Sequence, residues 1–362
     1  MSTPDTAGYT EFDVPYARVD GRELVLHVTR PAGQGSGPFP VLLDFHGGAW
    51  THFDHRVDLA WCRALAKNGV LCASVQFRLA PEHPWPAFIA DARAALRWLT
   101  AHGGTLGADV TRLGTIGGST GGFLSVLLGI NPRTENEAPT PALDTPDDLA
   151  PALPRVAIGF YPILDVVGRY RMVCDTEFPA HTRWLRERIG PPRHAPGHHM
   201  QAPVERLETL YALKARGGIL GNSAGRAVNA LINLASRAGF MRMAVYEELR
   251  QNHEGAFASV QQMHEASPLA RVSEGRQHNR PAILIVQGRD DINLTPRMSE
   301  DFVAAYRCRG GVAQLELPAD FPHAFATIPS PQSDYAIART QAFLAEHGLL
   351  ARQAGVASGA LA

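Results

Sequence analysis

The chain has 362 residues, of which 45% are hydrophobic and 19% are charged, and its formal net charge is −1. This length and composition suit one large α/β domain with an insertion, or two domains. The balanced charge gives no electrostatic reason to expect nucleic acid as a partner. The N-terminus is polar and no long apolar run is present, so we expect neither a signal peptide nor a membrane span.

The cysteines and histidines form no pattern typical of a metal site. A C-x-x-C spacing is absent, so we expect neither disulfides nor a zinc site. The same observation favours a cytoplasmic location. Three histidines in a segment rich in Pro and Gly match no metal-binding motif, and we expect a solvated loop there. The sequence therefore predicts neither a metal nor a cofactor. The residues concerned are Cys62, Cys72, Cys174 and Cys308, and His194, His198 and His199.

Short apolar runs alternate with longer amphipathic stretches over most of the chain. Over 86–102, for example, apolar residues recur every three or four positions and predict a helix with one buried face. Strands that alternate with helices predict an α/β fold whose mostly parallel central sheet has helices on both faces. The expected strands are 23–28, 40–45, 70–77, 113–117, 156–161, 282–287 and 312–317. The expected helices are 54–67, 86–102, 123–130, 296–307 and 332–347.

The segment 165–267 contains no run typical of a strand. The helices expected in it are 180–188, 203–214, 225–238 and 241–251. A helical insertion between two sheet strands predicts a cap that covers the carboxyl ends of the strands, shapes a pocket and excludes water. An insertion that serves only oligomerisation is the alternative, which leaves a homo-oligomer open. We therefore expect one domain made of 1–164 and 268–362, with 165–267 as a helical cap.

A serine lies in the glycine-rich turn 117–122, which joins an expected strand to an expected helix. The G-x-S-x-G pattern around Ser119 is typical of a nucleophile elbow, in which a sharp, strained turn exposes a reactive serine. Only small neighbours fit such a turn, and the helix N-terminus behind it favours negative charge. A structural turn with a buried serine is the alternative, so the interpretation depends on partners at other strand ends.

A second glycine-rich turn, His46-Gly47-Gly48-Ala49-Trp50, follows the expected strand 40–45. Acyl transfer builds an oxyanion, which requires backbone N–H donors about 3 Å away. A glycine pair lets the backbone approach closely and turn its N–H groups inward. We expect the amides of Gly47, Gly48 and Thr120 to form this oxyanion hole. Trp50 either lines the substrate pocket or packs the loop.

A base and an acid are expected towards the C-terminus. Among the fifteen histidines, His323 lies in a loop after the expected strand 312–317 and before the last helix. The acid that orients this histidine is expected after the strand 282–287, where the common G-x-x-D turn selects Asp291 and leaves Asp290 as the alternative. The chain order serine, aspartate, histidine is that of the α/β-hydrolases and differs from that of chymotrypsin and subtilisin.

The stretch 40–128 resembles the hormone-sensitive-lipase-like branch of the α/β-hydrolases, also called α/β-hydrolase fold-3. The turn 46–50 resembles the oxyanion motif of that branch, and Phe-Arg-Leu-Ala-Pro-Glu-His-Pro-Trp-Pro-Ala at 77–87 closely resembles its Y-R-L-A-P-E-x-x-F-P-A segment. The resemblance implies an α/β-hydrolase fold in which 1–164 and 268–362 form the catalytic domain.

Three residues depart from the motifs of this branch. Ala49 replaces the third glycine of H-G-G-G, and Gly118 and Thr120 replace the usual D-S-A neighbours of the serine. Gly118 and Thr120 also resemble the neighbours found in relatives that hydrolyse acetylated sugars, feruloyl esters or formamides.

The function implied is cleavage of a small to medium carboxylic ester through an acyl-enzyme on Ser119, with His323 as base and Asp291 as its orienting acid. The partner is then a small-molecule ester or amide, and no cofactor or metal is needed. Amide or formamide hydrolysis on the same triad is one alternative. A non-catalytic ligand receptor is another, although such proteins tend to lose the nucleophile or the base.

Overall fold

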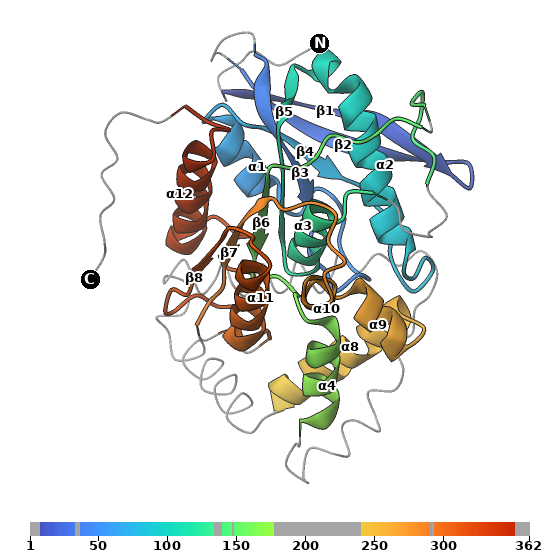
Figure 1. The fold of residues 1–362 in the computed structure, drawn as a ribbon, viewed down its shortest axis with the longest axis vertical. Helices are drawn as coiled ribbons and strands as arrows, with labels where there is room; N and C mark the ends of the chain where they lie inside the picture. The colour runs from blue at the N-terminus through green and yellow to red at the C-terminus, as the bar shows by residue number, and fades with distance from the viewer. Residues whose placement is uncertain are drawn as a thin grey trace, which may run out of the picture.

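The computed structural model describes residues 8–32, 37–133, 140–146, 148–176, 240–289, 291 and 293–351. An eight-stranded sheet with the order β1-β2-β4-β3-β5-β6-β7-β8 runs through these residues (Figure 1). The strands from β4 to β8 in this order pair in parallel, which confirms the predicted mostly parallel sheet. The strands are β1 Tyr9–Val19, β2 Arg22–Pro31, β3 Phe39–Phe45, β4 Leu71–Val75, β5 Ala108–Gly118, β6 Val156–Phe160, β7 Ala282–Val286 and β8 Ala313–Glu316.

The edge strand β1 was not predicted from the sequence. Its residues alternate only in part between buried and exposed, and its antiparallel register with β2 shifts between Pro15 and Ala17. This bulge interrupts the period of two by which a strand is recognised. The turn at Asp20 and Gly21, which have φ values of 50° and 78°, is a hairpin signal that points to the missed strand.

Helices cover both faces of the sheet, with α1 and α12 on one face and α2, α3 and α11 on the other (Figure 1). Successive side chains of β3 point to opposite faces of the sheet, so this strand contributes apolar side chains to the core on both faces. Leu42 packs under α1 and α12, whereas Val41 and Leu43 pack under α2 and α3. These helices and their short neighbours are α1 Leu59–Ala66, α2 Ala87–His102, η1 Gly103–Leu106, α3 Thr120–Ile130, α10 Pro268–Ser273, α11 Pro296–Cys308 and α12 Pro331–Glu346.

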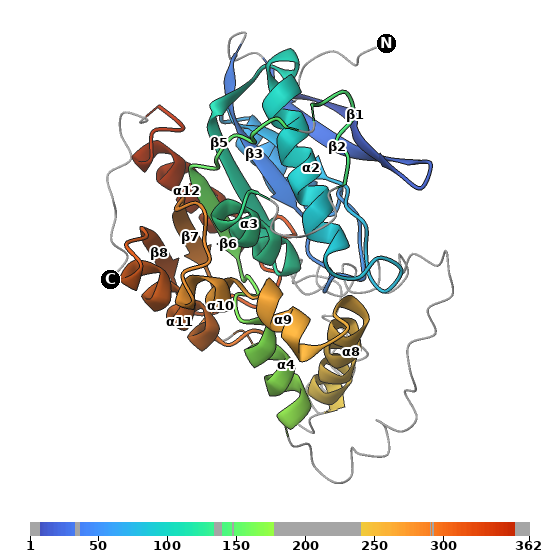
Figure 2. The ribbon, with the colours of Figure 1, turned by 45° about the vertical axis from the view of Figure 1, so that its right-hand side comes forward.

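Three further helices lie together at the lower end of the molecule in Figures 1 and 2. They are α4 Val166–Asp175, α8 Phe240–Ala256 and α9 Val260–Ala266. The expected helix 241–251 lies within α8. The expected helices 180–188, 203–214 and 225–238 lie outside the described residues, so the cap as a domain stays a prediction.

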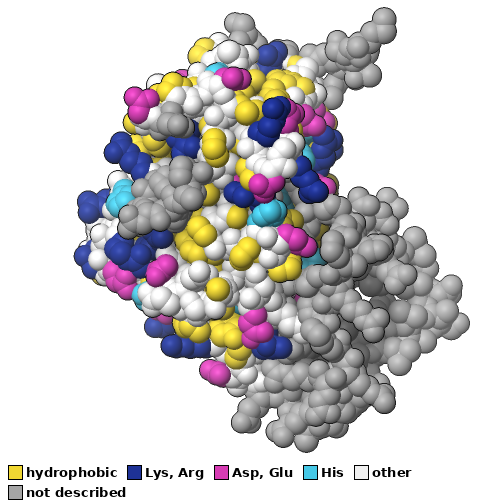
Figure 3. Space-filling model, turned by 90° about the vertical axis from the view of Figure 1, so that its right-hand side faces the viewer, with side chains coloured by type: hydrophobic (Ala, Val, Ile, Leu, Met, Phe, Trp, Pro, Cys, Tyr) yellow, Lys and Arg dark blue, Asp and Glu magenta, His cyan; other side chains and the backbone are white. Residues whose placement is uncertain are grey.

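Basic and acidic side chains are mixed on the face of the molecule that Figure 3 shows, as the net charge leads one to expect. Within the described ranges, none of the helices combines the length and the apolar character that a bilayer span requires. The described residues also contain no group of three His, Cys, Asp or Glu side chains placed to hold a metal ion. His194, His198 and His199 lie outside these residues.

A buried carboxyl group stands near the end of β3. Asp44 is 1% exposed and accepts hydrogen bonds from Nε1 of Trp61 at 2.9 Å and from the hydroxyl of Ser74 at 2.7 Å. Burial raises the pKa of Asp44 to about 6, because the charged form loses hydration that these donors replace only in part. Between its ordinary pKa of 3.8 and this raised value, the native state binds a proton that the unfolded chain does not.

We expect Asp44→Asn to remove one component of the pH dependence of stability. A pKa raised by folding stabilises the native state below pH 3.8, and this stabilisation is lost as the pH rises through about 6. As the pH rises from 3.8 to about 6, the free energy of unfolding of the wild type should therefore fall by about 1–3 kcal/mol relative to that of the variant. Urea unfolding of both proteins at several pH values measures the difference.

Asp109→Asn is the control for this experiment. A hydrogen bond from Thr111 lowers the pKa of Asp109, so this carboxylate stabilises the native state above its ordinary pKa and its removal gives the opposite trend. A constant difference between the wild type and Asp44→Asn across the range would contradict the assignment.

Candidate active site

Ser119 occupies the sharp turn between β5 and α3. Its φ and ψ are 55° and −118°, a strained conformation for a residue with a side chain. A hydrogen bond from the Ser119 amide to the carbonyl of Phe160, at 2.9 Å, helps to fix this turn. A Cβ on Gly121 would lie 1.8 Å from the carbonyl oxygen of Phe45, and one on Gly117 would lie 2.5 Å from the same oxygen. Only glycine fits at these two positions, as the elbow interpretation requires.

The structure also explains the glycine that precedes the serine. A Cβ on Gly118 would lie 2.9 Å from both Cε2 and the hydroxyl oxygen of Tyr161. Tyr161 is buried, and its ring also lies beside that of His323, with centroids 4.9 Å apart. The tyrosine ring thus fills the space that the aspartate of a D-S-A motif would need.

Ser119, His323 and Asp291 come together from the ends of β5, β8 and β7. His323 Nε2 lies 3.2 Å from Ser119 Oγ, and His323 Nδ1 lies 2.8 Å from Asp291 Oδ2. A carboxylate can only accept, so Nδ1 carries the proton and Nε2 is free to accept the proton of the serine. The geometry therefore matches that of a nucleophile, a base and an orienting acid. Asp290 lies outside the described residues.

Asp291 is held as a charged acceptor. Its Oδ1 accepts hydrogen bonds from the amides of Asn293 at 2.8 Å and Leu294 at 3.1 Å, and its Oδ2 accepts one from Nε2 of Gln287 at 2.9 Å. Burial would raise the pKa of Asp291, but His323 and the two amides outweigh it and keep this pKa below its usual value. The carboxylate stays ionised at neutral pH, which is the state that orients a histidine.

The loop after β3 lies directly against the elbow. A Cβ on Gly47 would lie 3.2 Å from the carbonyl oxygen of Gly118 and 3.4 Å from the Cβ of Ser119. Gly48 has a φ of 116°, and a Cβ there would lie 2.1 Å from the carbonyl oxygen of His52. Gly47 thus brings backbone close to the serine, and Gly48 allows the tight turn of the same loop, as expected of an oxyanion loop.

The backbone of Gly47 also contacts a buried carboxyl group. Asp58 precedes α1 but does not cap it, and its buried carboxyl group makes hydrogen bonds with the Gly47 amide and the Thr327 hydroxyl. Burial and the neighbouring Asp44 nevertheless raise the pKa of Asp58 well above its usual range. Since an amide has one hydrogen, this contact competes with an oxyanion for the Gly47 amide, and Gly47, Gly48 and Thr120 all stay predicted donors.

His46 supports this loop and takes no place beside the serine. Its ring stacks on Phe77 with centroids 4.4 Å apart, and its Nδ1 donates to the carbonyl of Gly47 at 2.6 Å. Burial lowers the pKa of His46 to about 4, so the ring is neutral at physiological pH. Phe77 opens the segment 77–87, so this motif contacts the oxyanion loop through a ring stack.

Trp50 packs the loop. The side chain is 1% exposed, and its ring meets those of Phe123, His253 and Phe257 edge to face at centroid distances of 5.8, 4.9 and 5.1 Å. Of the two roles weighed for Trp50, the structure shows packing, and an open pocket wall is not observed.

The sheet order and the strand–serine–helix turn define an α/β-hydrolase fold, and comparisons with known proteins agree. A family model described as alpha/beta hydrolase fold matches residues 42–190. Esterase LipI of Mycobacterium tuberculosis is 42% identical over 95 residues, which cover 26% of this chain and 30% of that protein. Lipase 2 of a Moraxella species is 29% identical over 189 residues, which cover 46% of this chain and 44% of that protein. The chain thus matches less than half the length of these curated relatives.

A solved structure extends the likeness beyond the matched segment. The thermophilic esterase Est2 of Thermogutta terrifontis, in its propionate-bound form, aligns with 97% of this chain and 98% of its own at a TM-score of 0.61. The sequences are 18% identical, so this likeness shows the fold alone. The segment 42–190 resembles the α/β-hydrolase family, and this likeness agrees with the family predicted from the motifs.

We expect Gly118→Ala to lower the stability of the protein through Tyr161. The added methyl group would overlap the buried tyrosine ring, and overpacking of this kind costs about 1–3 kcal/mol. The loss should shrink in a Tyr161→Leu background, where the ring is gone. Urea unfolding of both single variants and the double variant gives the coupling energy.

Gly104→Ala serves as the control, because nothing lies within 4 Å of a Cβ at that position. An equal loss from Gly118→Ala in both backgrounds would show that Tyr161 is not the obstacle.

Proposed function

We propose that the chain is a serine hydrolase that cleaves a small to medium carboxylic ester. The observation that carries the proposal is the pair of contacts from His323, 3.2 Å to Ser119 Oγ and 2.8 Å to Asp291 Oδ2. His323 Nε2 takes the serine proton while Ser119 Oγ attacks the ester carbonyl, and the protonated imidazole then returns this proton to the leaving alcohol. Water attacks the acyl-enzyme by the same route and releases the acid.

The oxyanion of each tetrahedral intermediate is proposed to bind the amides of Gly48 and Thr120, with the amide of Gly47 as a third predicted donor. Thr120 is the first residue of α3, and the first amides of a helix have no acceptor within their own helix. The positive end of the helix dipole adds to the attraction. The Asp58–Gly47 contact helps by holding the loop that presents the next amide.

The relatives support an ester as substrate, because they are named as an esterase and a lipase. Their matched segments are partial, so the activity of this chain rests on its own site. Amide or formamide hydrolysis by the same triad stays the alternative. A receptor without catalysis is disfavoured by the alignment of three catalytic groups at hydrogen-bonding distance.

The cap is proposed to control access to this site. Ala49, which follows the glycine pair, packs against a small cluster of Val173, Tyr246 and Leu249, which belong to α4 and α8. These helices therefore contact the proposed oxyanion loop directly. A catalytic domain of 1–164 and 268–362, the cap 165–267, a cytoplasmic location and a homo-oligomer stay predictions.

Ser119→Ala should abolish hydrolysis. Loss of a triad nucleophile lowers kcat by about 10⁵–10⁶-fold, because the remaining groups can only assist direct attack by water. The measurement uses p-nitrophenyl esters of increasing chain length, together with p-nitroanilides of the same acids, so that ester and amide chemistry are compared in one experiment.

The control is Ser125→Ala on the same helix, whose hydroxyl is buried and donates to the carbonyl of Ile158 at 2.9 Å. A fluorophosphonate probe should label the wild type and the folded Ser125→Ala protein, and should not label Ser119→Ala. Full hydrolysis by Ser119→Ala would refute the proposed function.

Asp291→Asn should lower kcat by about 10³–10⁴-fold, since an amide in this place favours the wrong tautomer of His323. Asp290→Asn is the matched control, because it removes the adjacent carboxylate of the same turn. Steady-state kinetics on a single ester compare the two. A larger loss in Asp290→Asn than in Asp291→Asn would assign the acid to Asp290.

A further inference from the structure

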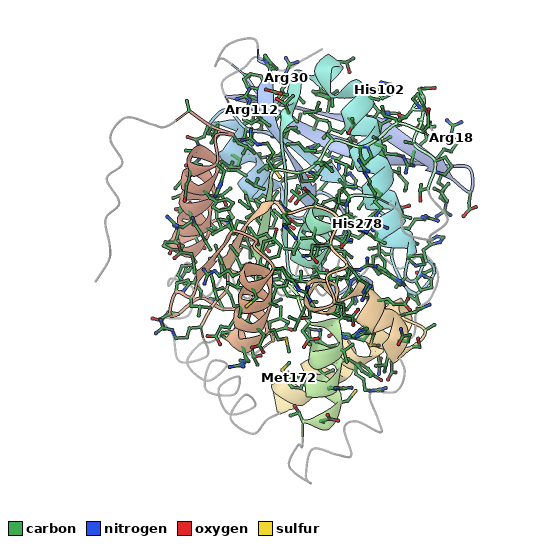
Figure 4. All side chains as sticks on the ribbon, viewed as in Figure 1. Arg18, Arg30, His102, Arg112, Met172 and His278 are labelled. Carbon is green, nitrogen blue, oxygen red and sulfur yellow. The ribbon has the colours of Figure 1, made fainter. Side chains whose placement is uncertain are left out.

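Arg169 is a buried arginine beside the proposed catalytic acid. It lies on α4, the helix on which Figure 4 labels Met172, and it is 1% exposed. Its Nη2 donates to the side-chain oxygen of Asn293, whose own amide donates to Asp291 Oδ1 at 2.8 Å. Burial lowers the pKa of Arg169 to about 10, so the guanidinium still carries its charge at neutral pH. A positive charge is thus fixed one residue away from the triad.

Most of this guanidinium lacks partners. In the part of the chain that the structure describes, neither Nε nor Nη1 of Arg169 has a hydrogen-bond partner, and no carboxylate forms an ion pair with it. Asp291 is the acid whose charge acts on it, but that carboxylate is already shared among His323 and two backbone amides. A buried charge with unused donors is costly, and its presence calls for a ligand or a function.

Two other buried polar atoms, on neighbouring elements, also have no described partner. They are Nε1 of Trp50, which follows the oxyanion loop, and Nε2 of His253 on α8. Their rings are 4.9 Å apart, and His253 also feels the charge of Arg169.

His253 cannot supply the missing counter-charge. Its Nδ1 donates to the carbonyl of Leu249 at 2.6 Å, and burial, helped by Arg169, lowers its pKa to about 3. The ring is therefore neutral, and it adds no negative charge beside Arg169.

We propose that Arg169 binds a carboxylate carried by the substrate, so that the enzyme prefers esters with a free carboxylate, such as half-esters of short dicarboxylic acids. The inference rests on the proposed esterase function and names its substrate class. The unused N–H groups of Arg169 donate to the carboxylate oxygens. The ester carbonyl at Ser119 and the carboxylate at Arg169 would then be held at the two ends of one short chain.

The test compares two methyl esters of the same length, monomethyl glutarate and methyl pentanoate, which differ by a carboxylate in place of a methyl group. The wild type should have the higher kcat/KM for monomethyl glutarate, mainly through a lower KM. Arg169→Met, which is apolar and of similar length, should lower the ratio of the two kcat/KM values at least tenfold. Arg169→Lys should restore part of this ratio, because the charge returns without the guanidinium geometry.

Arg93→Met is the matched control. Arg93 is a buried arginine on α2 that donates to the carbonyl of Asn131, so its loss perturbs the fold without touching the proposed site. It should lower both kcat/KM values in proportion and leave their ratio unchanged. If Arg169→Met also lowers both in proportion, or if the wild type prefers methyl pentanoate, Arg169 has only a structural role and the proposal is wrong.

A binding measurement separates this proposal from the proposed function. Calorimetric titration of Ser119→Ala with monomethyl glutarate should show binding that is at least tenfold weaker in Ser119→Ala/Arg169→Met. This result would support the carboxylate site even if no ester were hydrolysed by the wild type. Equal affinity of the two proteins would overturn the site even if the wild type proved to be an esterase.

Discussion

The arrangement of the site depends on the close approach of two backbone segments, the end of β3 and the turn between β5 and α3. The carbonyl oxygen of Phe45 lies where a Cβ of Gly121 would be, at 1.8 Å, and within 2.5 Å of a Cβ on Gly117. Parallel pairing of β3 with β5 through Phe45 and Gly117 fixes this approach. The loop after β3 and the serine turn both start from these paired residues. The backbone of Gly47 therefore lies directly against Ser119, and a Cβ on Gly47 would be 3.4 Å from the Cβ of the serine.

Behind the loop, the buried polar groups are kept neutral or are matched to donors. His46 is neutral and donates to the loop, and Asp58 accepts the amide of Gly47. Asp44 shares this environment and has a raised pKa as well. Two full negative charges here would oppose the oxyanion that the loop is proposed to stabilise. Burial and the neighbouring Asp44 raise the pKa of Asp58 well above its usual range, which favours its protonated form and removes one of these two charges.

The residues that could be predicted from the sequence are those with a local signal. Ser119, His323 and Asp291 each follow a strand that an apolar run reveals, and parallel strands bring their carboxyl ends to one edge of a sheet. Asp58 and Arg169 have no such signal, because their roles arise from contacts with Gly47 and Asn293 to which no sequence pattern links them. The donor assignment of Gly47 stays a prediction for the same reason. A glycine pair shows that backbone approaches closely, but the direction of each amide depends on a distant acceptor.

The substitution of alanine for the third glycine of the oxyanion motif links the loop to the helices above it. Ala49 has a φ of 51°, which costs a residue with a Cβ about 1 kcal/mol relative to glycine. Its methyl group, which glycine would lack, packs against Val173, Tyr246 and Leu249. The strain is thus offset by a contact with α4 and α8, the same helices that carry Arg169 and His253. A motion of these helices would therefore act on the proposed oxyanion loop and on the buried charge together, so the proposed substrate recognition by Arg169 and the proposed catalysis at Ser119 would share one physical connection.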